Sequence, residues 1–298
     1  MSGVTVRVPA KVNVQLAVGA ARPDGFHDLA SVFLAVSLYD EVTATPADTL
    51  TITCEGPDAD RVPLDRGNLA ARAAELLAAR HGLSPDVHLH IAKAIPVAGG
   101  MAGGSADGAG ALLACDALWG LGTPREELLE LCAELGSDVP FSLVGGAALG
   151  VGRGERLTPL PVAGPFHWVF AVADGGLSTP AVYGEFDRLA EGVEIPEPVA
   201  SPALLDALAS GDTTALAAAL VNDLQPAALS LRPSLAATLA AGTEAGALAA
   251  LVSGSGPTTA FLVKDAESAE AVAAALTASG TCRATRLATS PAPGATLL

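Results

Sequence analysis

The stretch Pro96-Val97-Ala98-Gly99-Gly100-Met101-Ala102-Gly103-Gly104-Ser105-Ala106 separates two segments of different pattern. Alternating apolar residues predict a strand over 87–92, and a run rich in Ala and Leu predicts a helix over 107–119. A strand, a glycine turn and a helix are typical of a phosphate cradle, because glycines let backbone N–H groups approach an anion and the helix start adds free donors. The glycine order fits neither Walker A nor Gly-x-Gly-x-x-Gly. We predict an anion site, and the alternative is a turn that only packs a helix on a sheet.

The composition favours a soluble protein over a nucleic-acid or membrane protein. The chain has 298 residues, half of them hydrophobic, so two domains can each bury a core. Thirty-two acidic against sixteen basic residues give a net charge of −16, which repels phosphodiester backbones and anionic membranes. The four cysteines lack zinc spacing, and the N-terminus lacks the pattern of a signal peptide. We therefore expect a reduced, cytoplasmic protein.

Helices and strands alternate irregularly along the chain, which predicts an α+β fold and not a doubly wound parallel sheet. The capping box Thr123-Pro124-Arg125-Glu126 predicts a helix with Thr123 as N-cap and Pro124 at its first position. The stretch after Thr289 is expected to be a loose tail. The other expected strands cover 4–16, 29–38, 41–54 and 168–172 and two segments within 246–263, and the other expected helices cover 68–81, 201–209, 213–221 and 266–279.

Three segments together resemble the GHMP kinase family of small-molecule kinases. They are Pro9-Ala10-Lys11-Val12-Asn13, the glycine stretch with Ser105, and Leu251-Val252-Ser253-Gly254-Ser255-Gly256-Pro257-Thr258. The resemblance implies a two-domain GHMP kinase fold. Residues 1–155 would form a ribosomal-protein-S5-like β/α domain that binds ATP and carries catalysis. Residues 156–298 would form a ferredoxin-like α/β domain that completes the substrate site.

Further segments narrow the resemblance to one branch of the family. They are Arg22-Pro23-Asp24-Gly25-Phe26-His27-Asp28-Leu29, Gly136-Ser137-Asp138-Val139-Pro140-Phe141, Leu177-Ser178-Thr179-Pro180-Ala181-Val182-Tyr183 and Asn222-Asp223-Leu224. That branch uses ATP to phosphorylate the 2-hydroxyl of a cytidine diphosphate conjugate of methylerythritol, on a route to isoprenoid precursors. A kinase for homoserine or mevalonate is the alternative within the family. A non-catalytic RNA-binding module is the alternative outside it, and the net charge disfavours that class.

The resemblance assigns the chemistry to Asp138 and Lys11. Asp138 stands beside an apolar stretch, and a carboxylate in such a place needs a partner or a role. The family pattern makes Asp138 the general base for the substrate hydroxyl, with Lys11 as its cationic partner. The alternatives are a helix-capping Asp138 and a surface Lys11.

Four residues are expected to bind the substrate. Asn13 is two residues from Lys11 and so on the same strand face, where it would position the methylerythritol hydroxyls. By resemblance, His27 hydrogen-bonds cytosine, and Phe26 and Tyr183 stack on the two faces of the base. Core packing is the alternative for both aromatic residues.

ATP is expected to bind along the whole glycine stretch, residues 96–106. Kinases need Mg²⁺ to shield the phosphates, and Ser105 is the hydroxyl expected near it, without a dedicated protein-only metal site. Asn68 is either an adenosine contact or a helix N-cap. Lys93 either approaches ATP or is a solvated lysine at a strand end.

His88 and His90 share one strand face, but no third ligand is near in the sequence, so we expect surface residues and not a metal pair. The expected partners are the small-molecule substrate and ATP, without nucleic acid or membrane. The expected state is a monomer or a weak homodimer.

Overall fold

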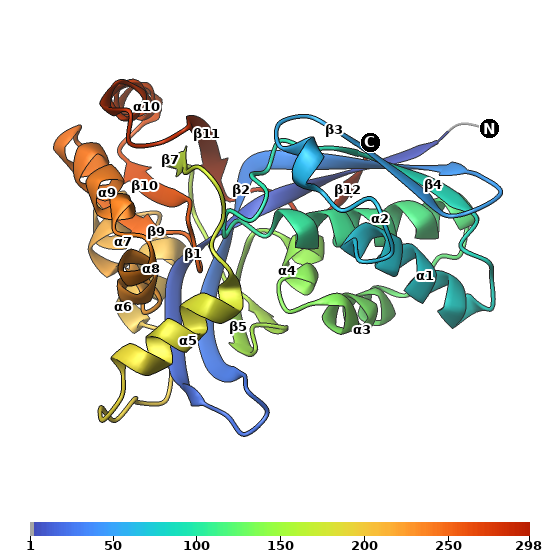
Figure 1. Cartoon of the computed structure of the whole chain (residues 1–298), viewed down its shortest axis with the longest axis horizontal. Helices are drawn as coiled ribbons and strands as arrows, with labels where there is room; N and C mark the ends of the chain where they lie inside the picture. Colours follow the sequence, from blue (N-terminus) through green and yellow to red (C-terminus); the bar gives the residue numbers. More distant parts are fainter. Residues whose placement is uncertain (1–2) are drawn as a thin grey trace.

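The structure is a computed structural model that describes residues 3–298, so Met1 and Ser2 of the expected first domain lie outside it. It contains two β-sheets with helices packed on them, an α+β arrangement as expected (Figure 1). The eight-stranded sheet consists of β1 (Val4–Ala21), β2 (His27–Pro46), β3 (Thr51–Glu55), β4 (Val87–Ala92), β5 (Ala147–Gly152), β6 (Arg156–Pro159), β8 (Val221–Asn222) and β12 (Thr296–Leu297). The four-stranded sheet consists of β7 (Phe166–Val172), β9 (Ala249–Val252), β10 (Thr259–Val263) and β11 (Ala284–Ser290).

The helices of the first half are η1 (Ala59–Arg61), α1 (Leu69–His81), α2 (Gly103–Trp119), α3 (Arg125–Leu135) and α4 (Val139–Val144). Those of the second half are α5 (Thr179–Leu189), α6 (Pro202–Ser210), α7 (Thr213–Ala219), α8 (Gln225–Leu231), α9 (Ser234–Glu244) and α10 (Ala266–Ser279). Figure 1 shows α9 and α10 beside the small sheet at one end of the molecule, and α1 to α4 beneath the large sheet at the other. Within residues 3–298, no helix combines the length and the apolar character needed to cross a membrane.

A long hairpin of β1 and β2 connects the two halves (Figure 1). The expected strands 29–38 and 41–54 are wrong in their division, because β2 runs unbroken to Pro46 and β3 follows separately. The two parts of β2 that the sequence suggested as separate strands have different neighbours. The first part pairs with β5 and the last part with β4, and the register against β1 shifts between Pro9 and Ala10. This irregularity lies between the part of β2 that pairs with β5 and the part that pairs with β4.

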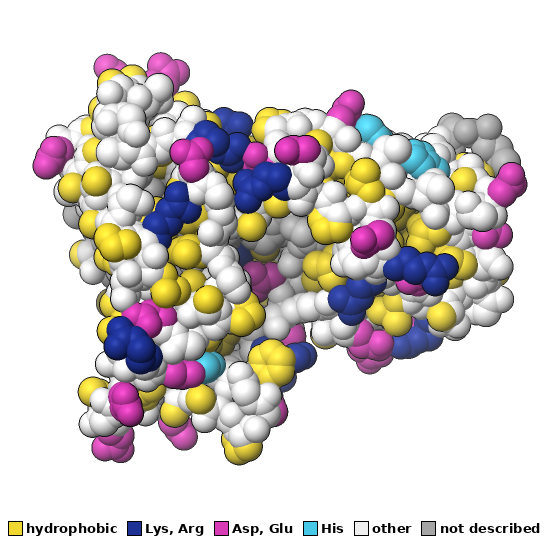
Figure 2. Space-filling model, viewed as in Figure 1, with side chains coloured by type: hydrophobic (Ala, Val, Ile, Leu, Met, Phe, Trp, Pro, Cys, Tyr) yellow, Lys and Arg dark blue, Asp and Glu magenta, His cyan; other side chains and the backbone are white. Residues whose placement is uncertain are grey.

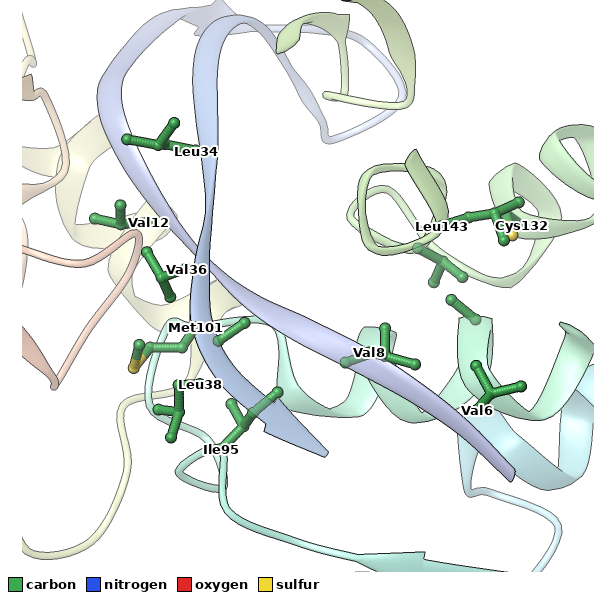
Figure 3. Close-up of a cluster of buried hydrophobic side chains, with 14 of the residues drawn as sticks. Val6, Val8, Val12, Leu34, Val36, Leu38, Ile95, Met101, Cys132 and Leu143 are labelled. Atoms are coloured by element: carbon green, nitrogen blue, oxygen red, sulfur yellow. The ribbon is translucent and has the colours of Figure 1, made fainter. Parts of the chain in front are cut away.

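The glycine-rich helix α2 packs closely on the hairpin. A Cβ atom at Gly110 would lie 2.8 Å from Val8 and 2.9 Å from Val42, so the close approach of helix and sheet requires glycine there. Figure 3 shows Met101, just before the helix, within the same buried cluster as Val36. The start of α2 is therefore held on the sheet by burial of the residues around it.

Several local expectations are corrected. Helix α2 starts at Gly103 and not at residue 107, and α3 starts at Arg125 with Pro124 as N-cap, so the expected capping box does not form. The Thr123 hydroxyl instead lies 3.1 Å from Nε2 of His81. The sequence did not predict the helices α4, α5, α8 and α9 or the strands β5, β6, β8 and β11.

The end of the chain is not a loose tail. Thr296 and Leu297 form β12 against β1, and the Ala292 N–H donates to the carbonyl of Ala35 at 3.0 Å. The domain boundary at residue 155 stays a prediction. The change of sheet falls later, between the end of β6 and Phe166, and both β8 and β12 add strands from the second half to the large sheet.

Candidate active site

A cavity of about 740 Å³ lies between the glycine stretch, the β1–β2 hairpin, α5 and the turn after β9. The face of the molecule in Figure 2 is hollowed near its centre, between the two halves. The lining includes Lys11, Asn13, Phe26, His27, Gly99, Gly100, Gly103, Gly104, Ser105, Asp138 and Tyr183. Segments between residues 11 and 256, far apart in the sequence, therefore meet at one cavity.

Lys11 and Asp138 come together there. Nζ of Lys11 lies 3.6 Å from Oδ2 of Asp138, and the Lys11 side chain is 6% exposed, so the surface-lysine alternative is wrong. Burial lowers the pKa of Lys11, and the Asp138 carboxylate partly offsets that effect. Asp138 occupies the N-cap position of α4, but its side chain makes no capping hydrogen bond. Its carboxylate is therefore free to face the cavity.

The glycine stretch is locked against the turn that follows β9. Gly100 has a φ of 76°, and a Cβ atom there would lie 2.0 Å from the carbonyl oxygen of Ser253. The Gly100 carbonyl accepts hydrogen bonds from Nζ of Lys11 at 3.0 Å and from Oγ of Ser253 at 3.1 Å. The loop, the lysine and the C-terminal glycine motif thus form one structure, although they lie far apart in the sequence.

The start of α2 presents free donors to the cavity. Its N-cap, Ala102, offers no side-chain acceptor, and Gly103, Gly104 and Ser105 line the cavity. Free N–H groups and the positive end of a helix dipole favour a bound phosphate. Elsewhere in the stretch, Met101 and Ala106 are fully buried in the core, and the cavity lining omits Pro96 and Val97. The loop therefore divides into residues that face the cavity and residues that anchor it.

Asn13 is buried beside Lys11, on the same side of β1. Its Oδ1 accepts a hydrogen bond from Nζ of Lys11 at 2.5 Å, and its Nδ2 donates to Oγ of Ser31 at 2.7 Å. Both polar ends of the side chain therefore have partners. The amide holds the lysine in position while it also lines the cavity.

Aromatic residues form the other end of the cavity. The His27 and Tyr183 ring centroids lie 4.9 Å apart, and Phe26 is 47% exposed with the Arg153 guanidinium 5.0 Å from its ring centroid. An exposed Phe26 is not a core residue, which removes that alternative for it. Tyr183 packs against a small buried cluster and also lines the cavity. Nε2 of His27 lies 2.8 Å from Oδ1 of Asp187.

Lys93 has neither of its expected positions. It is 4% exposed, and its Nζ donates to Oδ2 of Asp40 at 2.5 Å and to Oδ2 of Asp107 at 2.9 Å. Burial by itself lowers the pKa of Lys93, but the two carboxylates overcome it and raise that pKa. Asp40 also accepts from the N–H groups of Ala94 and Ile95. This buried cluster ties the entry of the glycine stretch to β2 and α2.

The remaining candidates serve local structure. Asn68 caps α1, since its Oδ1 accepts from the N–H of Ala70 at 2.8 Å and its Nδ2 donates to the carbonyl of Pro63. His88 lies between the hydroxyl groups of Thr51 and Thr53. His90 contacts the Thr53 hydroxyl through Nδ1.

Among the cavity-lining residues to which the sequence analysis assigned no role are three polar ones, Ser31, Arg153 and Asp187. Asp187 follows Tyr183 by four residues, a spacing that places both on one face of a helix. A sequence analysis that predicted α5 would therefore have placed Asp187 beside Tyr183. No sequence signal points to Ser31, which reaches Asn13 only through the pairing of β1 with β2.

Comparison with known proteins identifies the family. The model described as GHMP kinases N terminal domain matches residues 68–146, and the model described as GHMP kinases C terminal matches residues 204–282. A protein of Streptomyces avermitilis is 81% identical over 295 residues, which is 99% of each chain. The chain belongs to the GHMP kinase family. The expected two-part GHMP kinase fold is thereby confirmed.

Three relatives that are 62% to 81% identical to this GHMP kinase have the name 4-diphosphocytidyl-2-C-methyl-D-erythritol kinase. The S. avermitilis protein has it, and so does a Streptomyces coelicolor protein that is 78% identical over 99% of each chain. A Thermobifida fusca protein of that name is 62% identical and covers all of this chain and 99% of its own. The narrower resemblance expected from the sequence is therefore confirmed.

Solved structures show the same fold. A crystal structure of 4-(cytidine 5'-diphospho)-2C-methyl-D-erythritol kinase superposes with a TM-score of 0.78 at 33% identity, covering 95% of this chain and 98% of its own. A homoserine kinase from Cytophaga hutchinsonii reaches 0.77 at 20% identity, covering 100% and 98%. At that identity the second likeness concerns the fold alone.

Proposed function

We propose that this GHMP kinase transfers the γ-phosphoryl group of ATP to the 2-hydroxyl group of 4-diphosphocytidyl-2-C-methyl-D-erythritol, on the methylerythritol phosphate route to isoprenoid precursors. One observation carries the proposal: the glycine loop and the Lys11–Asp138 pair line the same cavity as Phe26, His27 and Tyr183. An anion cradle and an aromatic end in one cavity fit a substrate that is held by its base and reacts at a distant hydroxyl. The names of the relatives support the same activity.

Asp138 is the general base in the proposed mechanism. Its carboxylate takes the proton of the 2-hydroxyl as the oxygen attacks the γ-phosphorus, the bond to the β-phosphate oxygen breaks and ADP leaves. Lys11 holds the carboxylate on one side and faces the forming negative charge on the other. Asn13 and the Gly100 carbonyl fix the lysine in that position. Because these groups are already placed, little reorganisation accompanies the reaction.

ATP binds with its phosphates at the start of α2. The free N–H groups of Gly103, Gly104 and Ser105 are the donors expected to hold them. Mg²⁺ normally keeps several waters and binds through few protein oxygens plus the substrate phosphates. One hydroxyl, that of Ser105, fits this mode, and residues 3–298 contain no group of three His, Cys, Asp or Glu side chains arranged for a metal. Bound with ATP, Mg²⁺ would neutralise phosphate charge.

The test is incubation with ATP, Mg²⁺ and a panel of alcohols: the cytidine conjugate, free methylerythritol, homoserine and mevalonate. Mass spectrometry should find one added phosphate on the conjugate, and free methylerythritol should react very poorly because it lacks the cytidine group. Efficient phosphorylation of homoserine or mevalonate in place of the conjugate would overturn the proposal. The Asp138→Asn variant is the matched control for chemistry at this site.

A cytoplasmic location, a monomer or weak homodimer, and the absence of nucleic-acid partners stay predictions. Sedimentation at several protein concentrations would test the oligomeric state, and a filter-binding assay with RNA would test for a nucleic-acid partner.

A further inference from the structure

Three residues of helix α5 contact the His27 side chain at the aromatic end of the cavity. From its inward face, Tyr183 places its ring 4.9 Å from the His27 ring, and Phe186 meets the same ring edge-on at 6.0 Å. Four residues after Tyr183, Asp187 brings Oδ1 to 2.8 Å from Nε2 of His27. The imidazole side chain is 5% exposed, so these contacts leave it little freedom.

The carboxylate determines which ring nitrogen carries the proton. An ionised carboxylate only accepts hydrogen bonds, so Nε2 of His27 must donate to Asp187. In a neutral imidazole the other nitrogen, Nδ1, then has a free lone pair and can only accept. Among the described residues Nδ1 has no hydrogen-bond partner, and His27 lines the cavity. A neutral His27 held in this way therefore presents an acceptor in a fixed orientation to the cavity.

We infer that Asp187 is a positioning residue that makes the site selective for cytosine over uracil by holding His27 in its Nε2-protonated form. The inference rests on the proposed function only for the identity of the base end. The 4-amino group of cytosine is a donor and matches the Nδ1 acceptor of His27. Uracil has a carbonyl oxygen at that position, so two acceptors would face each other without water, and the buried groups would stay unpaired.

The first experiment measures binding and does not depend on phosphoryl transfer. With the ATP site filled by the non-hydrolysable analogue AMP-PNP, calorimetry compares CDP with UDP. The wild type should prefer CDP by about 10- to 100-fold, the usual discrimination from base-edge hydrogen bonds. In Asp187→Asn the amide can present its N–H to Nε2 and reverse the proton position, so the preference should fall to within about threefold.

Two variants separate this role from a merely structural one. Asp187→Glu keeps an acceptor-only group and should retain most of the preference for CDP. Glu185→Gln removes another carboxylate of α5, one that pairs with Arg188 and Ser230 away from the cavity, and should leave the preference unchanged. Equal loss in Glu185→Gln and Asp187→Asn would assign the effect to helix stability and overturn the inference.

The second experiment observes the proton directly. Nitrogen NMR of histidine-labelled protein, with the His27 signals assigned by their loss in His27→Gln, should show Nε2 protonated and Nδ1 free in the wild type. The Asp187→Asn variant should show a mixture. A wild-type His27 protonated at Nδ1, or a wild type that binds UDP as well as CDP, would refute the inference. The substrate panel above tests the activity separately, so either conclusion can fail alone.

Discussion

Substitution of Asp107 should change how stability depends on pH. Asp107 lies in α2, where its Oδ2 accepts from Lys93 and its buried Oδ1 has no hydrogen-bond partner among residues 3–298. Burial raises the pKa of Asp107 to about 7 from an ordinary value of 3.8, with the nearby Asp40 adding to the rise and Lys93 opposing it. A carboxyl group whose pKa is raised in the folded state binds its proton more tightly there than in the unfolded chain. Its contribution to stability is complete below pH 3.8 and is lost as the pH rises through about 7.

The magnitude follows from that difference. The pKa of Asp107 in the folded protein exceeds its ordinary value by about 3 units. Since each pKa unit is worth about 1.4 kcal/mol, this difference corresponds to about 4 kcal/mol at most. Between pH 5 and pH 8 the loss should be about 2–3 kcal/mol of the free energy of unfolding. Asp107→Asn resembles the protonated acid in shape and hydrogen bonding but does not titrate. Relative to wild type, this variant should therefore gain about 2–3 kcal/mol over the same range.

Urea denaturation followed by circular dichroism at pH 5, 6, 7 and 8 measures the effect. The quantity of interest is the variant free energy of unfolding minus the wild-type value at each pH, because other titrating groups then cancel. Asp206→Asn, which removes an exposed carboxylate from α6, controls for the change in net charge. Parallel curves for wild type and Asp107→Asn would show that burial does not hold a proton on Asp107, and the reasoning would be wrong.

Four further results are expected. Asp138→Asn should lower kcat by about two to four decades with substrate binding retained, and near-normal turnover would remove Asp138 from the mechanism. Lys11→Ala should also lower kcat strongly. In the double variant of Lys11→Ala and Asp138→Asn, the loss of kcat should be much smaller than the product of the two single losses, because the two side chains act as a unit. A loss equal to that product would contradict this. Tyr183→Ala should weaken binding of the cytidine conjugate by about 1–3 kcal/mol in calorimetry while ATP binding hardly changes, and an equal loss for ATP would refute a base stack. Gly100→Ala should weaken ATP binding and lower the thermal midpoint, since its Cβ would collide with the Ser253 carbonyl, and unchanged values would show that the two loops can separate.

Local sequence was a reliable guide where the determinant lies within a few residues. The glycine stretch predicted a turn before a helix, and the structure has one, although α2 begins at Gly103. The strand over 87–92 and the helix ending at Gly82 appear as expected. The family motifs pointed to the residues that line the cavity, because those short segments contain the glycines and polar groups that the site uses.

Pairing between distant segments was beyond the sequence. Lys93 resembled a solvated strand-end lysine, and its burial became visible only when β2 brought Asp40 beside it. The 41–54 pattern suggested one strand, but β2 ends at Pro46 and Thr51–Glu55 form β3, and the two strands pair with β4 as separate neighbours. The end of the chain lacked a strong strand pattern, and β1 supplies the hydrogen bonds that order it.

The sequence alone determined the α+β class, the family and which short segments contain the chemistry. The tertiary structure decided that Lys11 lies beside Asp138, that Lys93 pairs with Asp40 at the entry of the glycine stretch and that Asp187 orients His27. The physical reason is the range of the interactions. Turns and helix starts depend on backbone preferences of neighbouring residues, whereas contacts between residues far apart in the chain depend on sheet register and on the burial of apolar surface, which are properties of the whole fold.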